Sequence, residues 1–151
     1  MHNTLRSLLL CTFTAAITAC VTAPPPPPPT PAQEAWYQRR DATSTTFVVT
    51  AEKGEQAWSR AKAWLAQCSD FKLQTVDSEL LETYNPPSEI AVRMGYIVSR
   101  EKLDNGDWRF RVRAASGNEM AGQVAHWYAQ ALSLYIQTAE DCPGCPCGTR
   151  G

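Results

Sequence analysis

The most reactive side chains stand near the C-terminus, where Cys142, Cys145 and Cys147 fall within residues 142–147. Cysteine thiolates bind soft metal ions, and a Cys-x-x-Cys pair can exchange disulfides in redox enzymes. Redox motifs of that kind open a helix, whereas this one follows the last predicted helix among prolines and glycines. Structural disulfides are the third interpretation and the one that we favour, with metal binding and redox exchange kept as alternatives.

A row of arginines is the second candidate for chemistry. Arg109, Arg111 and Arg113 alternate with apolar residues, which predicts a strand with one cationic and one apolar face. Alternate strand residues stand about 7 Å apart, and Arg93 on the preceding strand could lie beside them. Guanidinium groups bind carboxylates and phosphates through a planar fork of donors, so the row is a candidate anion site.

The alternative is an ordinary solvated face on which carboxylates neutralise the arginines. The candidate acids are Glu79, Glu82 and Glu89.

The N-terminal residues predict export and a membrane anchor. Arg6 precedes a short apolar run over residues 8–17, too short for the ~20 residues of a membrane span but typical of a secretory signal. Ile17-Thr18-Ala19-Cys20 then resembles the lipobox of bacterial lipoproteins. The resemblance implies cleavage before Cys20 and acylation of Cys20, and several acyl chains anchor a protein stably. An ordinary signal peptide, cut at a nearby alanine, is the alternative.

The N-terminal segment also predicts the membrane to which the protein is sorted and the redox state of its compartment. Val21, rather than aspartate, follows the cysteine, and by resemblance to Gram-negative lipoproteins this predicts the outer membrane. An exported chain meets an oxidising compartment, where disulfides form. Four cysteines then remain to form disulfides, and they can pair in three ways: Cys68, Cys142, Cys145 and Cys147. We expect Cys68 to pair with Cys142, because both fall at helix ends, and Cys145 to pair with Cys147.

Length and charge limit the number of domains and the class of partner that the sequence allows. Without residues 1–19 the chain has 132 residues, enough for one domain, with 13 basic and 15 acidic side chains. This balance argues against a nucleic-acid partner. His126 is the one histidine outside the signal, and its predicted place on a polar helix face favours a solvated role. No phosphate-binding glycine loop or serine-nucleophile motif occurs, so we predict no cofactor, no metal and no enzyme.

Residues 20–44 are predicted to form a tether between the membrane and the domain. Prolines occupy positions 24–29 and 31, which favours polyproline II and a stiff spacer between membrane and domain. A ligand for a proline-binding partner is the alternative. Residues 33–44 form a lead-in whose Trp36-Tyr37 pair either docks on the domain or contacts a partner.

The domain itself is predicted at residues 45–139, followed by a cysteine-rich tail at 140–151. β-branched runs and alternation predict strands at 45–50, 71–76, 80–84, 90–99 and 108–114, with a tight turn at Asn105-Gly106. Helical spacing predicts an amphipathic helix from residue 51 to 70 and a second from 120 to 135. The first apolar stripe contains Ala57, Ala61, Trp64, Leu65 and Cys68, and the second contains Met120, Val124, Trp127, Tyr128, Ala131, Leu134 and Tyr135.

The order β-α-β-β-β-β-α predicts an α+β fold, an antiparallel sheet with two helices on one face. Several segments resemble bacterial secreted domains of unknown function with a TATA-binding-protein-like fold: Val49-Thr50-Ala51, the Ala57-Trp58-x-Arg60-Ala61-x-x-Trp64-Leu65 helix, Asp77, and the strands around Asn105-Gly106. The resemblance implies a fold, and it implies neither DNA binding nor any functional residue.

Together these features predict a lipid-anchored protein of the cell envelope that binds or scaffolds without catalysis. Its expected partners are the membrane, through the anchor, and an envelope protein, peptidoglycan or lipopolysaccharide. A thiol-dependent metal or redox protein is the runner-up, and an enzyme acting on envelope polymers comes third.

Overall fold

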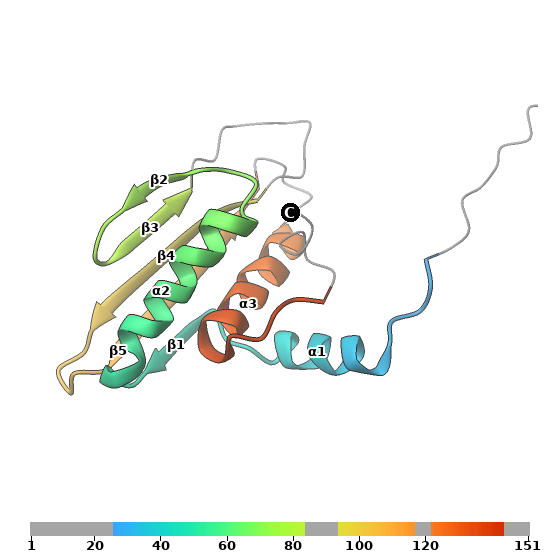
Figure 1. Ribbon diagram of the computed structural model, residues 1–151, viewed down its shortest axis with the longest axis horizontal. Helices are drawn as coiled ribbons and strands as arrows, with labels where there is room; N and C mark the ends of the chain where they lie inside the picture. Colours follow the sequence, from blue (N-terminus) through green and yellow to red (C-terminus); the bar gives the residue numbers. More distant parts are fainter. Residues whose placement is uncertain (1–25, 84–93, 117–121, 144–151) are drawn as a thin grey trace, which may run out of the picture.

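The computed structural model describes residues 26–83, 94–116 and 122–143 (Figure 1). The elements are, in chain order, α1 (Pro31–Asp41), β1 (Thr46–Val49), α2 (Ala51–Cys68), β2 (Leu73–Val76), β3 (Leu80–Thr83), β4 (Gly95–Lys102), β5 (Trp108–Ala115) and α3 (Gly122–Thr138). Among the helices of these ranges, none has the length and apolar character needed to cross a membrane.

The five strands form one antiparallel sheet in the order β1-β5-β4-β3-β2, and α2 and α3 lie on the same face of it (Figure 1). The predicted α+β fold, an antiparallel sheet with two helices on one face, is confirmed. The core lies between this sheet face and the two helices. Its fully buried side chains include Leu65, Leu81, Val98, Phe110, Leu132 and Ile136.

The apolar stripe predicted for α2 is the stripe that α2 buries. Ala57, Ala61, Trp64, Leu65 and Cys68 all belong to the core. The centre of that core is Phe110 of β5, which stacks on Phe47 of β1 at 5.4 Å between ring centroids and lies 6.1 Å from the ring of Trp58. Alternation in β5 therefore turns its aromatic side chain inward, as predicted.

Arg100 of β4 is buried against the first half of α2. The Arg100 guanidinium of β4 lies 4.6 Å from the Trp58 ring and 4.3 Å from the Trp108 ring. Arg100 donates from Nε to the Ser78 carbonyl at 2.7 Å and forms an ion pair with Glu55 at 2.8 Å. Cation–π contacts with two indole rings help to bury a charged group there.

The packing of Trp108 beside Arg100 also leaves room only for a glycine at position 54 of α2. Trp108 lies so close to Gly54 that a Cβ on Gly54 would stand 2.0 Å from the indole Cδ1. The Trp108 ring cannot move away freely, because Arg100 lies against it.

Gly54→Ala is therefore expected to lower the free energy of unfolding by about 1–3 kcal/mol through overpacking. Gly122→Ala is the matched control, because a Cβ at this glycine, also in a helix, meets nothing within 4 Å. Urea denaturation of both variants checks the prediction, and an unchanged Gly54→Ala midpoint would contradict it.

The segment that we predicted as a tether contains a helix. Thr30 and Gln33 cap α1 reciprocally: Gln33 N–H donates to Thr30 Oγ1 at 3.3 Å, and Thr30 N–H donates to Gln33 Oε1 at 2.8 Å. Pro31 occupies the first turn, where a missing N–H costs nothing. Pro31 thus starts a helix instead of extending the spacer, and this helix lies before the predicted domain boundary at residue 45.

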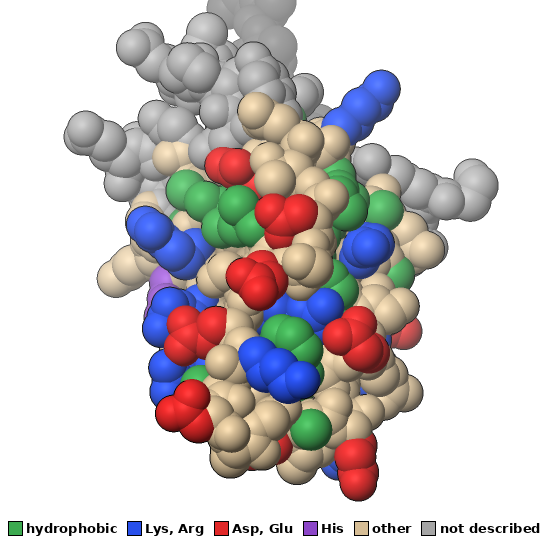
Figure 2. Space-filling view, turned by 90° about the vertical axis from the view of Figure 1, so that its left-hand side faces the viewer, with side chains coloured by type: hydrophobic (Ala, Val, Ile, Leu, Met, Phe, Trp, Pro, Cys, Tyr) green, Lys and Arg blue, Asp and Glu red, His purple; other side chains and the backbone are tan. Residues whose placement is uncertain are grey.

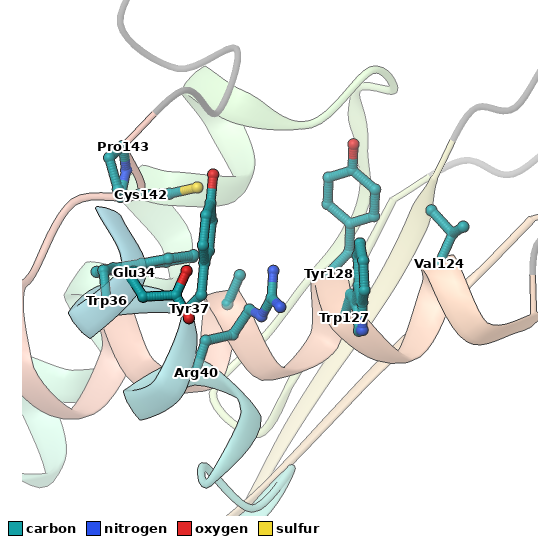
Figure 3. Close-up of a pocket in the computed structure, with 10 residues that line it drawn as sticks. Glu34, Trp36, Tyr37, Arg40, Val124, Trp127, Tyr128, Cys142 and Pro143 are labelled. Carbon is teal, nitrogen blue, oxygen red and sulfur yellow. The ribbon is translucent and has the colours of Figure 1, made fainter. Parts of the chain in front are cut away.

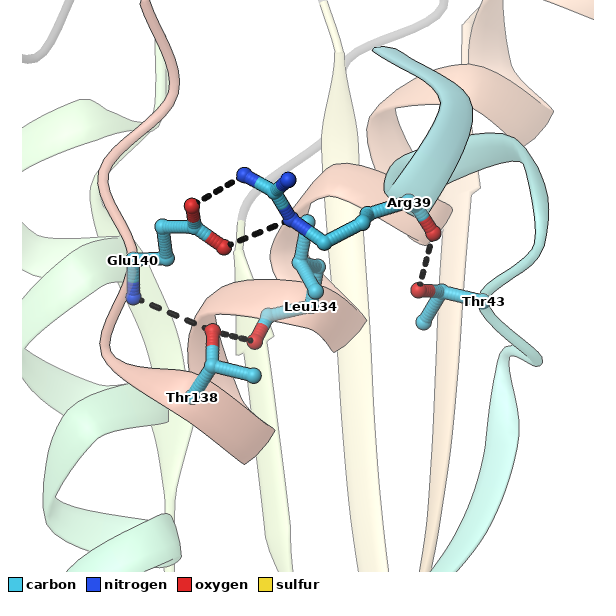
Figure 4. Close-up of polar contacts among 5 residues, drawn as sticks. All are labelled: Arg39, Thr43, Leu134, Thr138 and Glu140. Atoms are coloured by element: carbon cyan, nitrogen blue, oxygen red, sulfur yellow. Dashed lines mark hydrogen bonds and ion pairs between the residues drawn. The ribbon is translucent and has the colours of Figure 1, made fainter. Parts of the chain in front are cut away.

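Three kinds of contact hold α1 against α3. Trp36 is 3% exposed and packs with Ala131 and Leu134 of α3. Gln130 donates from Nε2 to the Asp41 carbonyl at 3.1 Å, at the end of α1. Arg39 forms an ion pair with Glu140, which follows α3 (Figure 4). The Trp36-Tyr37 segment therefore docks on the domain, which was one of the two alternatives.

Packing on two sides changes the interpretation of α3. Its sheet-facing residues in the core are Ala125, Ala129, Leu132 and Ile136, with Val124, Tyr128 and Tyr135 packed at the edge. Ala131 and Leu134, which we assigned to that stripe, pack instead against α1. Trp127, from the same predicted stripe, is 53% exposed. The prediction merged two apolar faces into one because it did not include α1.

Candidate functional site

A pocket of about 570 Å³ opens between α1 and α3 (Figure 3). Both helices and the segment after α3 contribute to its wall. The lining residues are Glu34, Trp36, Tyr37, Arg40, Val124, Trp127, Tyr128, Ala131, Cys142 and Pro143. The residue types that gather there are aromatic rings and one cation, which is a composition suited to holding a ligand.

Arg40 is the cationic group of the pocket, and Glu34 is the acidic one. Its guanidinium lies 5.7 Å from the Trp36 ring, 5.1 Å from the Tyr37 ring and 4.5 Å from the Trp127 ring. The Arg40 side chain is only 10% exposed. Nε and Nη2 both bond Asp41 Oδ1, at 2.8 and 2.7 Å. Three rings and one carboxylate thus keep a nearly buried cation in place.

Trp36 contributes an unsatisfied donor to the same pocket wall. Its indole Nε1 is buried and has no hydrogen-bond partner among the described residues. Leaving a buried donor unpaired costs about 1–3 kcal/mol, so native structures rarely retain one without a reason.

The groups that line this pocket can bind and orient a ligand. Arg40 supplies charge and donors, and Tyr37, Trp127 and Tyr128 supply ring faces (Figure 3). Cys142 at the edge is disulfide-bonded, so it has no thiolate to act as a nucleophile.

The predicted arginine row exists on the open face of the sheet. Arg109, Arg111 and Arg113 lie along β5, with side chains directed away from the buried residues of that strand. Glu101 on the neighbouring β4 stands opposite Arg109, forms an ion pair with it and bonds Arg111 at 3.3 Å. Arg93 lies outside the described residues.

This neutralisation weakens the row as an anion site. The acid that pairs with Arg109 and Arg111 is Glu101, which the sequence interpretation did not include. Exposed apolar side chains also share the face, because Val48 is the register partner of Arg109 and Ile97 that of Arg113. At the end of the molecule seen in Figure 2, basic and acidic groups are likewise interspersed.

Of the cysteines, Cys68 and Cys142 lie in described segments, and both are disulfide-bonded. Cys20, Cys145 and Cys147 lie outside those segments, so the anchor and the pairing stay predictions. Within the described residues no group of three or more His, Cys, Asp or Glu side chains could hold a metal ion.

A smaller cavity of about 140 Å³ lies beside Tyr96 of β4 and Arg113 of β5. Burial, with Tyr128 and Asp70 adding to it, raises the pKa of the Tyr96 phenol far above its usual range. Tyr96 therefore stays neutral and packs edge-on against the Trp64 ring at 5.1 Å between centroids. Its surroundings indicate a core tyrosine.

Comparison with known proteins identifies no relative: no family model matches the chain, and neither does a curated protein or a solved structure.

Sequence interpretation missed the pocket because it missed α1. Two signals could have revealed the helix: the Thr30-Pro31-x-Gln33 capping pattern, and the placement of Trp36 and Arg40 one helical turn apart. The proline run just before them suggested an extended chain instead.

Proposed function

We propose that the chain is an outer-membrane lipoprotein, anchored through Cys20, whose domain binds a component of the cell envelope without transforming it. One observation carries the proposal: α1, which walls the pocket with Arg40, begins at Pro31, only eleven residues after the lipobox cysteine. The proposed anchor and the α1 wall of the pocket thus belong to one short continuous segment.

The spacing sets how far the pocket can stand from the membrane. Residues 21–30 separate Cys20 from α1, and ten residues of polyproline II would extend about 30 Å. The pocket wall therefore stays within a few nanometres of the bilayer. Its ligands are expected among molecules of that zone, such as peptidoglycan, lipopolysaccharide or an envelope protein.

The pocket is suited to a binding role. Its volume of about 570 Å³ is in the usual range for small-molecule sites. The polar groups that face it, on Arg40 and Glu34, are ones that recognise a ligand by charge and hydrogen bonds.

The anchor is tested with Cys20→Ser. Wild-type protein extracted from membranes should have the mass of a chain that starts at Cys20 plus acyl groups. The variant should lack the acyl mass and leave the outer-membrane fraction, because serine cannot form the thioether. Cys11→Ser is the matched control, since Cys11 lies in the discarded signal. A wild-type mass without acyl groups, together with the same fractionation for Cys20→Ser and wild type, would overturn the proposal.

A further inference from the structure

We infer that the pocket between α1 and α3 binds an acidic sugar, meaning a sugar ring that bears a carboxylate or a phosphate. This inference rests on the proposed function only for where the ligand is found. The recognition itself is argued from the pocket.

Ring faces on two sides of the pocket suit a sugar. Tyr37 lies on one side of the Arg40 guanidinium, and Trp127 and Tyr128 lie on the other (Figure 3). The faces of aromatic rings are electron-rich, so they attract the weakly positive C–H bonds of a sugar ring. Trp127 is 53% exposed, so the part of its ring that the Arg40 guanidinium does not cover is available to a ligand.

The guanidinium at the base selects for an anion. Nε and Nη2 of Arg40 bond Asp41, which leaves Nη1 without a carboxylate among the described residues. Asp41 is 56% exposed, so it can turn to water when a ligand anion takes its place. A charge-assisted hydrogen bond in a nine-tenths-buried site is stronger than one in water.

Two further groups favour a sugar over a bare anion. Glu34 lines the pocket and can accept hydrogen bonds from hydroxyl groups. Trp36 also lines the pocket, and its buried N–H has no acceptor among the described residues, so a sugar oxygen that reached this N–H would satisfy it.

Other ligand classes fit less well. A purely apolar ligand would cover Arg40 without supplying an acceptor, which is costly for a buried charge. A polyanion would meet the carboxylate of Glu34 beside a single cation, Arg40. A ligand with one anionic group and a ring of alternating C–H faces and hydroxyls satisfies both constraints.

The test uses the mature protein, solubilised from membranes in detergent, and a matched pair of sugars. N-acetylmuramic acid differs from N-acetylglucosamine by a lactyl ether that carries the carboxylate. Calorimetric titration should show saturable binding of the acidic sugar and binding of the neutral one weaker by about tenfold or more. Equal affinity for the two sugars, or no binding of the acidic one at about 10 mM, would overturn the inference.

Variants locate the site. Trp127→Ala should weaken binding of N-acetylmuramic acid by about tenfold, because it removes one stacking wall. Arg111→Gln is the control and should change the affinity less than about twofold, since Arg111 lies on the open sheet face. Loss of binding in Arg111→Gln with unchanged binding in Trp127→Ala would move the site to the arginine row and refute the pocket.

The wild-type protein gives an independent readout if Trp127→Ala does not fold. The indole N–H resonances of Trp36 and Trp127 should shift on titration with the acidic sugar, while that of Trp58, in the core, should not. No shift at Trp36 and Trp127 would count against the pocket.

A third sugar identifies the source of the ligand. Tighter binding of glucosamine 1-phosphate than of N-acetylmuramic acid would point to a membrane glycolipid, and the reverse order to a carboxylated glycan. Either order supports an acidic-sugar site. The sugar-binding test and the anchor test can fail separately. A chain that carries no lipid but still binds N-acetylmuramic acid would refute the proposed anchor at Cys20 and support the acidic-sugar site.

Discussion

Trp36→Ala is expected to lower the free energy of unfolding by about 3–5 kcal/mol, the usual cost of removing a buried tryptophan. Trp36 is 3% exposed and packs against Ala131 and Leu134, so its ring is the main apolar contact of α1 with α3. Urea denaturation followed by circular dichroism measures the loss. Trypsin should also cleave the variant faster after Arg39 and Arg40, because α1 would leave the surface of α3.

Trp36→Phe is the matched control. It keeps an aromatic ring between α1 and α3 and removes the indole N–H that has no partner among the described residues. We expect a change below about 1.5 kcal/mol, because lost packing is offset by removal of the unsatisfied donor. If Trp36→Ala unfolded at the wild-type midpoint, α1 would be a loosely attached tether and the pocket would lack a fixed wall.

Reduction of the disulfides is expected to lower the free energy of unfolding by about 2–4 kcal/mol. Cys68 ends α2 in the core, and Cys142 packs beside Trp36 after α3, so cross-links at these positions restrain both helix ends. Urea curves with and without a phosphine reductant check the size of the effect. Identical curves would contradict it.

Cys142→Ala separates the contribution of this cysteine from the rest. The variant should lose stability in oxidising conditions and respond less to reductant than wild type. Peptide mapping without reduction then tests the predicted pairing of Cys68 with Cys142. A fragment that joins either cysteine to Cys145 or Cys147 would overturn that pairing and leave the stabilising role in place.

Much of the fold could be predicted because its signals are local and periodic. The alternation Trp108-Arg109-Phe110-Arg111 placed a strand with one buried face, and Asn105-Gly106 placed the turn before it, where Gly106 has a φ of +88°. The 3.6-residue spacing of α2 identified the side that meets the sheet. Each of these signals depends only on neighbours along the chain.

The candidate site could not be predicted in the same way. The sequence did indicate a row of arginines, but not that Glu101 stands opposite them, because strand register depends on how β4 and β5 align. Arg40 was predicted only as part of the lead-in and not as a site residue, since its partners Tyr37 and Trp127 lie on two helices far apart in the chain.

By itself the sequence determined the class of fold, the elements of the sheet and the apolar face of α2, because period and turn chemistry are local properties. It also predicts the anchor at Cys20, which no described residue tests. The tertiary structure alone decided that residues 31–41 belong to the domain, that α3 is packed on two sides, and that a buried arginine lies among aromatic rings. Those outcomes depend on which surfaces meet, and that is decided by packing between distant segments.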